Sequence, residues 1–277
     1  MPKLQHGDDV INYDQRGHGP DIVWIAGGDQ LGSDWHAWQT PAFEADFRCT
    51  TYDSRGVGAS VCMARPPWTM ADLAADCAAL IRAVCEPPVF LVSLSMGSSI
   101  AQELCLDHPE LVRAAVVMGT CADHGGFIAE WEQAEIEFRR AGGTLPEAFA
   151  ITHYAAFMYP SEVLGDEELW ARVRPVVEAA YGGRKGADLA AQWESCVNYR
   201  SIDRLPHCQV PLHVIAFGQD MQTPPALGKV VAEMAPKGHY HFLEGLGHCS
   251  AFGHRPDTVN TCIADILRPY VERDAAV

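Results

Sequence analysis

Short apolar runs alternate with helical patterns of apolar residues along much of the chain. The runs lie at about residues 10–16, 21–27, 48–53, 89–95, 112–119, 210–218 and 239–244, and each predicts a strand. Between the runs, residues 71–84, 98–106 and 258–267 have apolar side chains at helical spacing. Strands that alternate with helices are typical of a mostly parallel sheet with helices on both faces. The sequence therefore predicts an α/β fold.

The strand pattern stops between about residues 121 and 205, where several amphipathic helices follow one another. These helices are separated by glycines, at Gly142–Gly143, Gly165 and Gly182–Gly183. Two apolar stripes are predicted here, one made of Ile128, Trp131, Ala134 and Phe138 and the other of Leu145, Phe149, Thr152 and Ala156. Because this block interrupts the alternation, we expect residues 121–205 to form a helical cap inserted into a core made of residues 1–120 and 206–277.

Composition limits the classes of protein to which the chain can belong. Its 277 residues can bury a large core, and they fit one α/β domain with an insertion better than two separate domains. A formal net charge of −16 repels nucleic acid and anionic membranes at long range, so neither is an expected partner. Residues 1–10 lack a basic segment followed by an apolar run, and no later stretch is apolar enough to span a bilayer. These features predict a soluble, cytoplasmic protein.

The segment Ser93-Leu94-Ser95-Met96-Gly97 stands between a strand pattern and a helical one. This order is that of a nucleophile elbow, in which small neighbours let the chain turn sharply and expose a serine hydroxyl. A serine between small residues is also common in loops, but the flanking strand and helix favour the catalytic interpretation. Ser93 replaces the first glycine of the G-x-S-x-G pattern, and serine is small enough that we expect a strained turn. Ser95 is therefore the candidate nucleophile.

A serine hydroxyl is a weak nucleophile at neutral pH, so it needs a histidine as base and an acid that orients the histidine. Asp220 follows the strand predicted at 210–218, and His248 follows the last predicted strand. Ser, Asp, His is the chain order of hydrolases built on an α/β sheet. Asp123, which follows the strand predicted at 112–119, is an alternative acid. We predict a catalytic set of Ser95, His248 and Asp220.

With these motifs the chain resembles the α/β-hydrolase superfamily over nearly its whole length. Residues 52–60, YDSRGVGAS, are similar to the family's Y-D-x-R-G-x-G-x-S loop, in which the residues at Asp53 and Arg55 brace the backbone. The resemblance implies an α/β-hydrolase fold, with a mostly parallel eight-stranded sheet flanked by helices and an inserted helical cap. It also implies an oxyanion hole made by the N–H groups of Met96 and Gly28. Gly28 lies in the loop Ala26-Gly27-Gly28-Asp29, which we call the glycine loop, and Ala26 replaces the histidine usual there.

Other polar and aromatic residues are candidates for the substrate pocket or for a metal site. His153, Phe157 and Trp193 of the cap, together with Asp29 of the glycine loop, are candidate substrate contacts, although ordinary packing explains the cap residues equally well. His239 and His241 alternate on one strand without an acidic or cysteine partner nearby, which favours surface positions over a metal site. No metal and no cofactor are expected.

The ten cysteines are scattered and include no Cys-x-x-Cys pair. Without an export signal we expect them to be reduced and to serve as small apolar packing residues. Cys249 follows His248 and is expected near the site, but a serine already fills the nucleophile position.

The resemblance implies a serine hydrolase that cleaves a carboxylic ester, lactone or thioester of a small to medium organic molecule through an acyl-enzyme. The Gly27-Gly28-Asp29 part of the glycine loop and the Gly245-Leu246-Gly247-His248 segment are similar to those of small esterases, polyketide-tailoring methylesterases and enol-lactonases. Cofactor-free dioxygenases, C–C bond hydrolases and perhydrolase-type haloperoxidases of the superfamily have the same triad, as do receptors with very slow turnover. These alternatives stay open. The expected partner is a small-molecule substrate, and a homodimer is also possible. Residues 128–140 have two alternative roles, as a lid over the site or as the surface of that homodimer.

Overall fold

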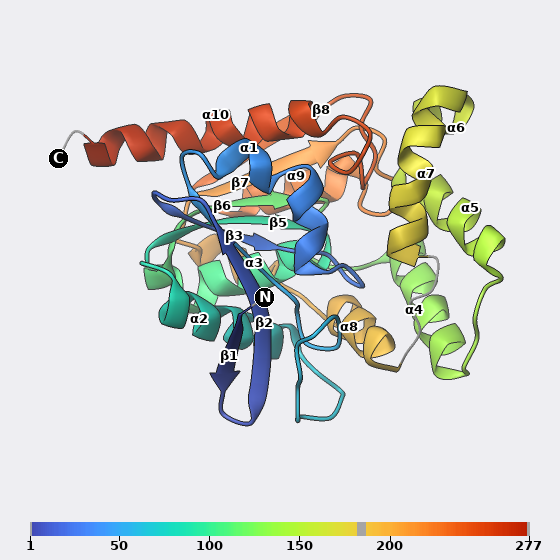
Figure 1. The fold of residues 1–277 in the computed structure, drawn as a ribbon, viewed down its shortest axis with the longest axis horizontal. Coiled ribbons are helices and arrows are strands. Elements are labelled where there is room, and N and C mark those ends of the chain that lie inside the picture. Colours follow the sequence, from blue (N-terminus) through green and yellow to red (C-terminus); the bar gives the residue numbers. More distant parts are fainter. Residues whose placement is uncertain (1, 182–186, 276–277) are drawn as a thin grey trace.

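The computed structural model describes residues 2–181 and 187–275 and has an eight-stranded sheet at its centre (Figure 1). The strands are β1 (Lys3–His6), β2 (Asp9–Arg16), β3 (Asp21–Ile25), β4 (Arg48–Tyr52), β5 (Val89–Leu94), β6 (Val112–Met118), β7 (Leu212–Phe217) and β8 (Gly238–Leu243). Their order is β1-β2-β4-β3-β5-β6-β7-β8. β2 is antiparallel to β1 and to β4, and all other neighbours are parallel. The predicted α/β fold with a mostly parallel sheet is confirmed.

All seven predicted strands form, but β1 was not predicted. Its sequence, KLQH, has no apolar run, and three of its four residues are exposed. It is held at the edge of the sheet by antiparallel pairing with β2, which periodicity alone does not reveal.

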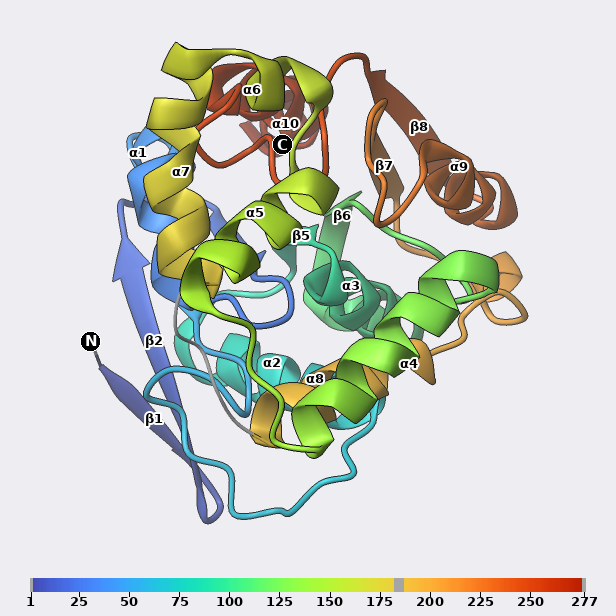
Figure 2. The same ribbon diagram turned by 90° about the vertical axis from the view of Figure 1, so that its right-hand side faces the viewer.

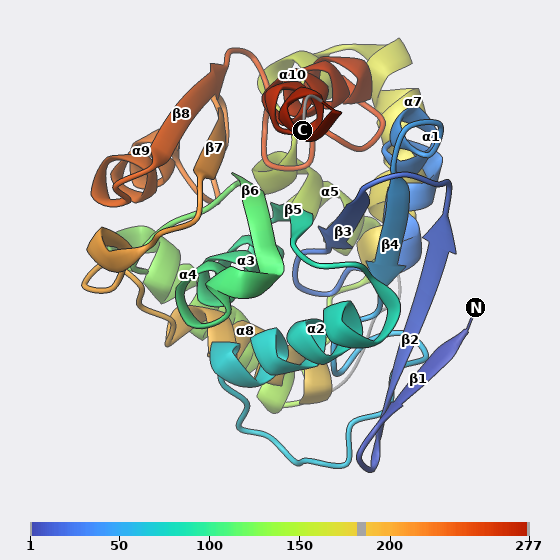
Figure 3. The ribbon, with the colours of Figure 1, turned by 90° about the vertical axis from the view of Figure 1, so that its left-hand side faces the viewer.

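Helices cover both faces of the sheet because its central strands are apolar on both sides. All six residues of β5 are buried, with Leu91 in one core cluster and Phe90 and Val92 in the other. One face packs against α2 (Met70–Val84), α3 (Met96–Asp107) and α9 (Pro225–Met234), and the other against α1 (Thr40–Phe43) and α10 (Pro256–Ala275). Figure 3 shows α2 and α3 on the side of the sheet opposite α1 and α10. Three short 3₁₀ helices, η1 (Gly32–Ala37), η2 (Pro109–Leu111) and η3 (Leu205–His207), lie in the connections.

In the described residues, five α-helices separate β6 from β7 in the sequence. They are α4 (Gly126–Arg140), α5 (Glu147–Met158), α6 (Ser161–Gly165), α7 (Glu167–Tyr181) and α8 (Ala187–Val197), and we call them the helical insertion. Figure 1 shows the helical insertion at the right of the molecule, and Figure 2, which faces that side, shows α4 and α8 side by side. The predicted break at Gly182–Gly183 lies outside the described residues.

The face that α4 buries differs from the predicted stripe. Of the predicted stripe, Ile128 is buried and Trp131 is half-buried, but Ala134 and Phe138 are exposed. α4 buries Glu132 and Glu135 instead. The prediction failed at these positions because two of the buried residues are glutamates, whose charges are compensated by nearby partners. Glu132 contacts His124, and Glu135 pairs with Arg139.

The stripe predicted for α5 also lies on the wrong side of the helix. Phe149, Thr152 and Ala156 are exposed, and α5 buries Ile151 and Ala155 instead. Apolar residues lie on nearly every side of α5, so periodicity could not select the buried face.

Two further features bear on the expected class of protein. None of the helices in the described residues is long and apolar enough to cross a membrane. All ten cysteines are described, and none is in a disulfide.

Candidate active site

The nucleophile elbow joins β5 to α3 at Ser95. Its backbone has φ 55° and ψ −125°, a left-handed conformation that side chains with a Cβ rarely adopt. The turn packs α3 closely against β3. A Cβ added at Gly97 would lie only 2.3 Å from the carbonyl oxygen of Ile25. Ser95 thus occupies a strained position that the surrounding structure must enforce, as expected for an elbow.

Ser93, the departure from the glycine pattern, fits into the interior without loss of hydrogen bonding. Its hydroxyl donates to the carbonyl oxygen of Val116 at 3.1 Å and lies 3.3 Å from the hydroxyl of Ser98. The Ser98 hydroxyl in turn donates to the carbonyl oxygen of Met118 at 2.8 Å. These two serines tie the elbow to β6, so the buried hydroxyl of Ser93 is satisfied.

His248 and Asp220 form a buried, fully oriented pair. His248 Nδ1 lies 2.7 Å from Asp220 Oδ2, and the two residues are 2% and 4% exposed. Asp220 Oδ1 accepts the backbone N–H groups of Gln222 at 2.9 Å and Thr223 at 2.8 Å, and Oδ2 accepts the Thr223 hydroxyl at 2.9 Å. Since carboxylate oxygens only accept, the imidazole proton is on Nδ1 and Nε2 is a hydrogen-bond acceptor.

Gly119, at the end of β6, gives the imidazole the space it occupies. A Cβ added there would lie 2.8 Å from His248 Cε1 and 2.9 Å from His248 Nδ1, and the φ of 53° also favours glycine. Neither Gly119 nor Thr223 was a sequence candidate. An isolated glycine after a strand carries no sequence signal for contact with a histidine distant in the chain.

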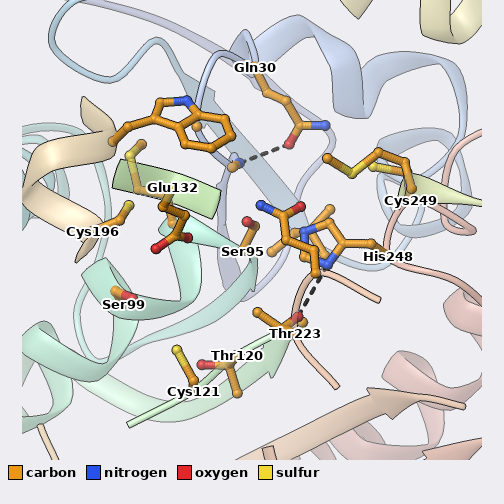
Figure 4. Close-up of a pocket in the computed structure, with 18 of the residues that line it drawn as sticks. Gln30, Ser95, Ser99, Thr120, Cys121, Glu132, Cys196, Thr223, His248 and Cys249 are labelled. Atoms are coloured by element: carbon orange, nitrogen blue, oxygen red, sulfur yellow. Dashed lines mark hydrogen bonds between the residues drawn. The ribbon is translucent and has the colours of Figure 1, made fainter. Parts of the chain in front are cut away.

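Ser95 and His248 line one pocket between the sheet and the helical insertion. Figure 4 shows both side chains beside the same cavity. Within the described residues the Ser95 hydroxyl has no hydrogen bond, and in a site without substrate such contacts are often longer than in the reacting complex. The pocket is lined by Gly27, Gly28, Gln30, Leu94, Ser95, Met96, Ser99, Gly119, Thr120, Cys121, His124, Glu132, Met158, Trp193, Cys196, Gln222, Thr223, His248 and Cys249.

The alternative acid, Asp123, is not in contact with His248. Its carboxylate forms an ion pair with Arg200, and its side chain is 41% exposed. The geometry therefore gives the orienting position to Asp220.

The two residues predicted to form the oxyanion hole line the pocket from two different segments. The N–H groups on either side of Gly28 are occupied, because Gly27 donates to Gln30 Oε1 at 2.9 Å and Asp29 donates to Gln192 Oε1 at 3.1 Å. In the described part of the chain, Gly28 N–H has no acceptor. Met96 begins α3, so its N–H has no acceptor within the helix. Both residues line the pocket, and their N–H groups can bind an oxyanion.

Of the four candidate substrate contacts, only Trp193 lines the pocket. The Trp193 ring packs edge-on against the Trp131 ring, with centroids 5.4 Å apart. Phe157 stacks on Trp131, with centroids 5.0 Å apart. His153 is further out, edge-on to Phe157 at 5.2 Å. His153 and Phe157 therefore support the wall from behind.

Asp29 is also absent from the pocket wall. It is 2% exposed, and its Oδ2 lies 2.8 Å from Arg139 Nη2. Arg139 belongs to α4, so this buried ion pair joins the glycine loop to the helical insertion. The structure gives Asp29 a bracing contact where the sequence suggested a substrate contact.

The histidines of β8 lie away from the pocket, beside His213 of β7. His213 Nδ1 and His241 Nε2 are 3.1 Å apart, and burial lowers the pKa of His213 to about 3. His239 stacks on His213 with a centroid distance of 4.5 Å. Among the residues described, no group of three or more His, Cys, Asp or Glu side chains is arranged to hold a metal ion.

Several known proteins resemble the chain in sequence and in fold. The alpha/beta hydrolase family matches residues 22–261. The putative non-heme bromoperoxidase BpoC of Mycobacterium tuberculosis is 35% identical over 91% of this chain and 95% of its own length, and its crystal structure superposes with a TM-score of 0.86 over 92% and 94% of the two chains. The 3-oxoadipate enol-lactonase 2 of Acinetobacter baylyi is 26% identical over 95% of both chains. The enol-lactonase from Burkholderia xenovorans, 22% identical, has the same fold with a TM-score of 0.85 over 96% of this chain and all of that chain.

Proposed function

The chain belongs to the alpha/beta hydrolase family, and from this premise we propose that it is a serine hydrolase that forms an acyl-enzyme. Its substrate is a carboxylic ester, lactone or thioester of a small to medium organic molecule. The observation that carries the proposal is the buried His248–Asp220 pair, whose 2.7 Å contact leaves Nε2 as an acceptor in a pocket that Ser95 also lines.

The proposed reaction begins when Ser95 Oγ attacks the carbonyl carbon and its proton moves to His248 Nε2. Asp220 keeps the imidazole in the required tautomer and stabilises the imidazolium that forms. The negative charge on the carbonyl oxygen is bound by the N–H groups of Gly28 and Met96, and each such donor contributes a factor of roughly 10² to 10³ in rate. His248 then protonates the leaving alcohol or thiol.

The acyl-enzyme is cleared by the reverse sequence of proton transfers. His248 takes a proton from water, which attacks the acyl carbon, and returns it to Ser95 Oγ as the acid product leaves. In this proposal residues 121–205 act as a cap that selects the substrate, because Glu132, Met158, Trp193 and Cys196 contribute to the pocket wall.

The relative BpoC supports a second candidate activity on the same acyl-enzyme. BpoC is named as a putative non-heme bromoperoxidase, and it is 35% identical to this chain. If hydrogen peroxide replaces water as the attacking group, the acyl-enzyme yields a peroxyacid and regenerates Ser95. The peroxyacid would then oxidise bromide away from the protein. Peroxide-dependent bromination in acetate that is lost in Ser95→Ala would support this candidate.

A fluorophosphonate probe and short p-nitrophenyl esters test the main proposal. We expect the probe to label wild type and to spare Ser95→Ala, and only wild type to hydrolyse the esters. Equal labelling of the two proteins would refute the assignment of Ser95. Labelling without ester turnover would favour the dioxygenase or receptor alternatives over the hydrolase.

A further inference from the structure

The pocket wall holds a second arrangement of nucleophile, imidazole and carboxylate, separate from Ser95, His248 and Asp220. Cys121 Sγ lies 3.2 Å from His124 Nε2, and His124 Nδ1 lies 2.7 Å from Glu132 Oε2. All three residues line the pocket. Cys121 and His124 come from the loop between β6 and α4, and Glu132 comes from α4. Figure 4 shows Cys121 and Glu132 on the wall of the cavity, on the side away from His248.

This cluster has the geometry of an activated thiol. A nucleophile lies within hydrogen-bonding distance of a ring nitrogen, and the other ring nitrogen is fixed by an acid. The side chains of His124 and Glu132 are each only 6% exposed. The His124–Glu132 pair is thus buried and oriented, with the free ring nitrogen directed at the sulfur of Cys121. This arrangement goes beyond the packing role expected for most cysteines in the chain.

The charge on His124 also favours an activated thiol at Cys121. Burial by itself lowers the pKa of the imidazole, but hydrogen bonds to Cys121 and Glu132 outweigh it and raise the pKa to about 10. His124 is therefore an imidazolium at neutral pH, and its Nε2–H donates to the sulfur. A charge-assisted hydrogen bond of this kind stabilises the negative charge that sulfur carries when it attacks an electrophile.

We propose that Cys121 is a second reactive nucleophile of the pocket and a covalent modification site for small, soft carbon electrophiles, such as haloacetamides and α,β-unsaturated carbonyl compounds. With iodoacetamide, the sulfur forms a bond to the methylene carbon, the C–I bond breaks, iodide leaves with its electron pair, and the thiol proton passes to solvent. Displacement at a saturated carbon develops no oxyanion, so this reaction needs none of the donors that serve Ser95.

The adduct on Cys121 occupies space that the substrate needs. It therefore blocks the reaction at Ser95, a consequence that rests on the proposed function. The modification itself does not depend on Ser95.

Cys196 provides an internal control that is less buried than Cys121. It lines the same pocket from α8, but over the residues described its thiol makes no hydrogen bond to an imidazole, and burial raises its pKa well above the ordinary value. A reagent that enters the pocket meets both thiols. Cys121 is 3% exposed and is the more buried of the two, so faster reaction at Cys121 reports chemistry rather than exposure.

The experiment is brief exposure of wild type and Ser95→Ala to iodoacetamide at neutral pH, followed by peptide mass spectrometry. We expect Cys121 to be carbamidomethylated about tenfold faster than Cys196 or more, and at the same rate in both proteins. Equal rates at the two thiols would overturn the proposal, and this comparison needs no variant of the cluster. Normal Cys121 labelling with no fluorophosphonate reaction at Ser95 would refute the hydrolase assignment alone.

Two variants of the cluster test the mechanism of activation. Glu132→Gln keeps the size of the side chain and removes its charge, and His124→Gln removes the imidazolium. We expect each to slow Cys121 labelling about tenfold relative to Cys196 in the same protein, which also controls for altered packing. Unchanged ratios in both variants would show that Cys121 is not activated by these residues.

Discussion

Replacement of Asp220 by asparagine tests the role of the buried acid. Asp220 Oδ1 accepts two backbone N–H groups, from Gln222 at 2.9 Å and Thr223 at 2.8 Å. In Asp220→Asn these donors hold the amide oxygen at the Oδ1 position, so the NH₂ group takes the Oδ2 position, 2.7 Å from His248 Nδ1. An NH₂ group donates, and His248 must then accept through Nδ1 and carry its proton on Nε2.

That tautomer cannot take the proton of Ser95. We expect kcat to fall by about 10⁴-fold, equivalent to about 5 kcal/mol of lost transition-state stabilisation. Since asparagine has nearly the same shape as aspartate and keeps the two backbone hydrogen bonds, the fold should be retained, which circular dichroism can check.

The assay is single-turnover hydrolysis of a short p-nitrophenyl ester by Asp220→Asn, with Asp123→Asn as the matched control. Asp123 pairs with Arg200 at the surface, with a side chain 41% exposed, so its replacement should leave kcat within about twofold of wild type. A kcat for Asp220→Asn above about a tenth of wild type, or a large loss in Asp123→Asn, would refute this reasoning.

Three further predictions follow from contacts near the pocket. Gly119→Ala places a Cβ 2.8 Å from His248 Cε1, so the imidazole must shift and kcat of ester hydrolysis should fall about 100-fold. Arg139→Ala removes the cation 2.8 Å from the buried carboxylate of Asp29, which should lower the free energy of unfolding in urea by about 3 kcal/mol. The pKa of His124 is raised from 6.5 to about 10, so its charge stabilises the fold fully below pH 6.5 and loses this effect as the pH rises through 10. The difference in free energy of unfolding between wild type and His124→Gln, measured in urea, should therefore shrink between pH 6.5 and 10.

Each of these predictions has a control and an outcome that contradicts it. Gly125→Ala adds a methyl group with nothing within 4 Å and should leave kcat unchanged; equal losses at Gly125 and Gly119 would count against the steric argument. Arg174→Ala breaks an exposed pair with Glu178 and should cost less than about 1 kcal/mol. A similar cost for Arg139→Ala would show that its ion pair is not important to the fold. A stability difference for His124→Gln that grows with pH would contradict the sign derived from its raised pKa.

The strands and the order of the chemical groups were predictable because both are local in the sequence. Each central strand is buried on both faces and reads as an apolar run, and the groups at its carboxyl end follow directly. Ser95 and Asp220 each follow such a run, whereas His248 follows β8, an edge strand with no fully buried residue. β1 lacks this signal because its side chains are mostly exposed.

The buried faces of the helical insertion were not predictable from periodicity. α4 turns Glu132 and Glu135 inward. Glu132 pairs with His124, and Glu135 pairs with Arg139 of the same helix and accepts a hydrogen bond from the Tyr154 hydroxyl of α5. A hydropathy pattern cannot anticipate buried carboxylates, because their burial depends on partners placed by the fold.

Contacts between distant segments were also hidden from the sequence. Gly119 makes room for His248, although the two are far apart in the chain. Cys121 and His124 are close in sequence, but only the position of α4 brings Glu132 to the imidazole. Asp29 was placed beside the site by its sequence neighbours, whereas the structure directs its carboxylate to Arg139.

Trapping of the acyl-enzyme is the most direct test of the central claim, that Ser95 is acylated with His248 as the base. Wild type is mixed with p-nitrophenyl acetate, quenched in acid within the first turnover and analysed by peptide mass spectrometry. We predict an acetyl group on the peptide that contains Ser95, with its formation strongly slowed in Asp220→Asn and absent in Ser95→Ala. An acetyl group on another residue with none on Ser95, or turnover with no acylated intermediate in either wild type or Asp220→Asn, would contradict the account.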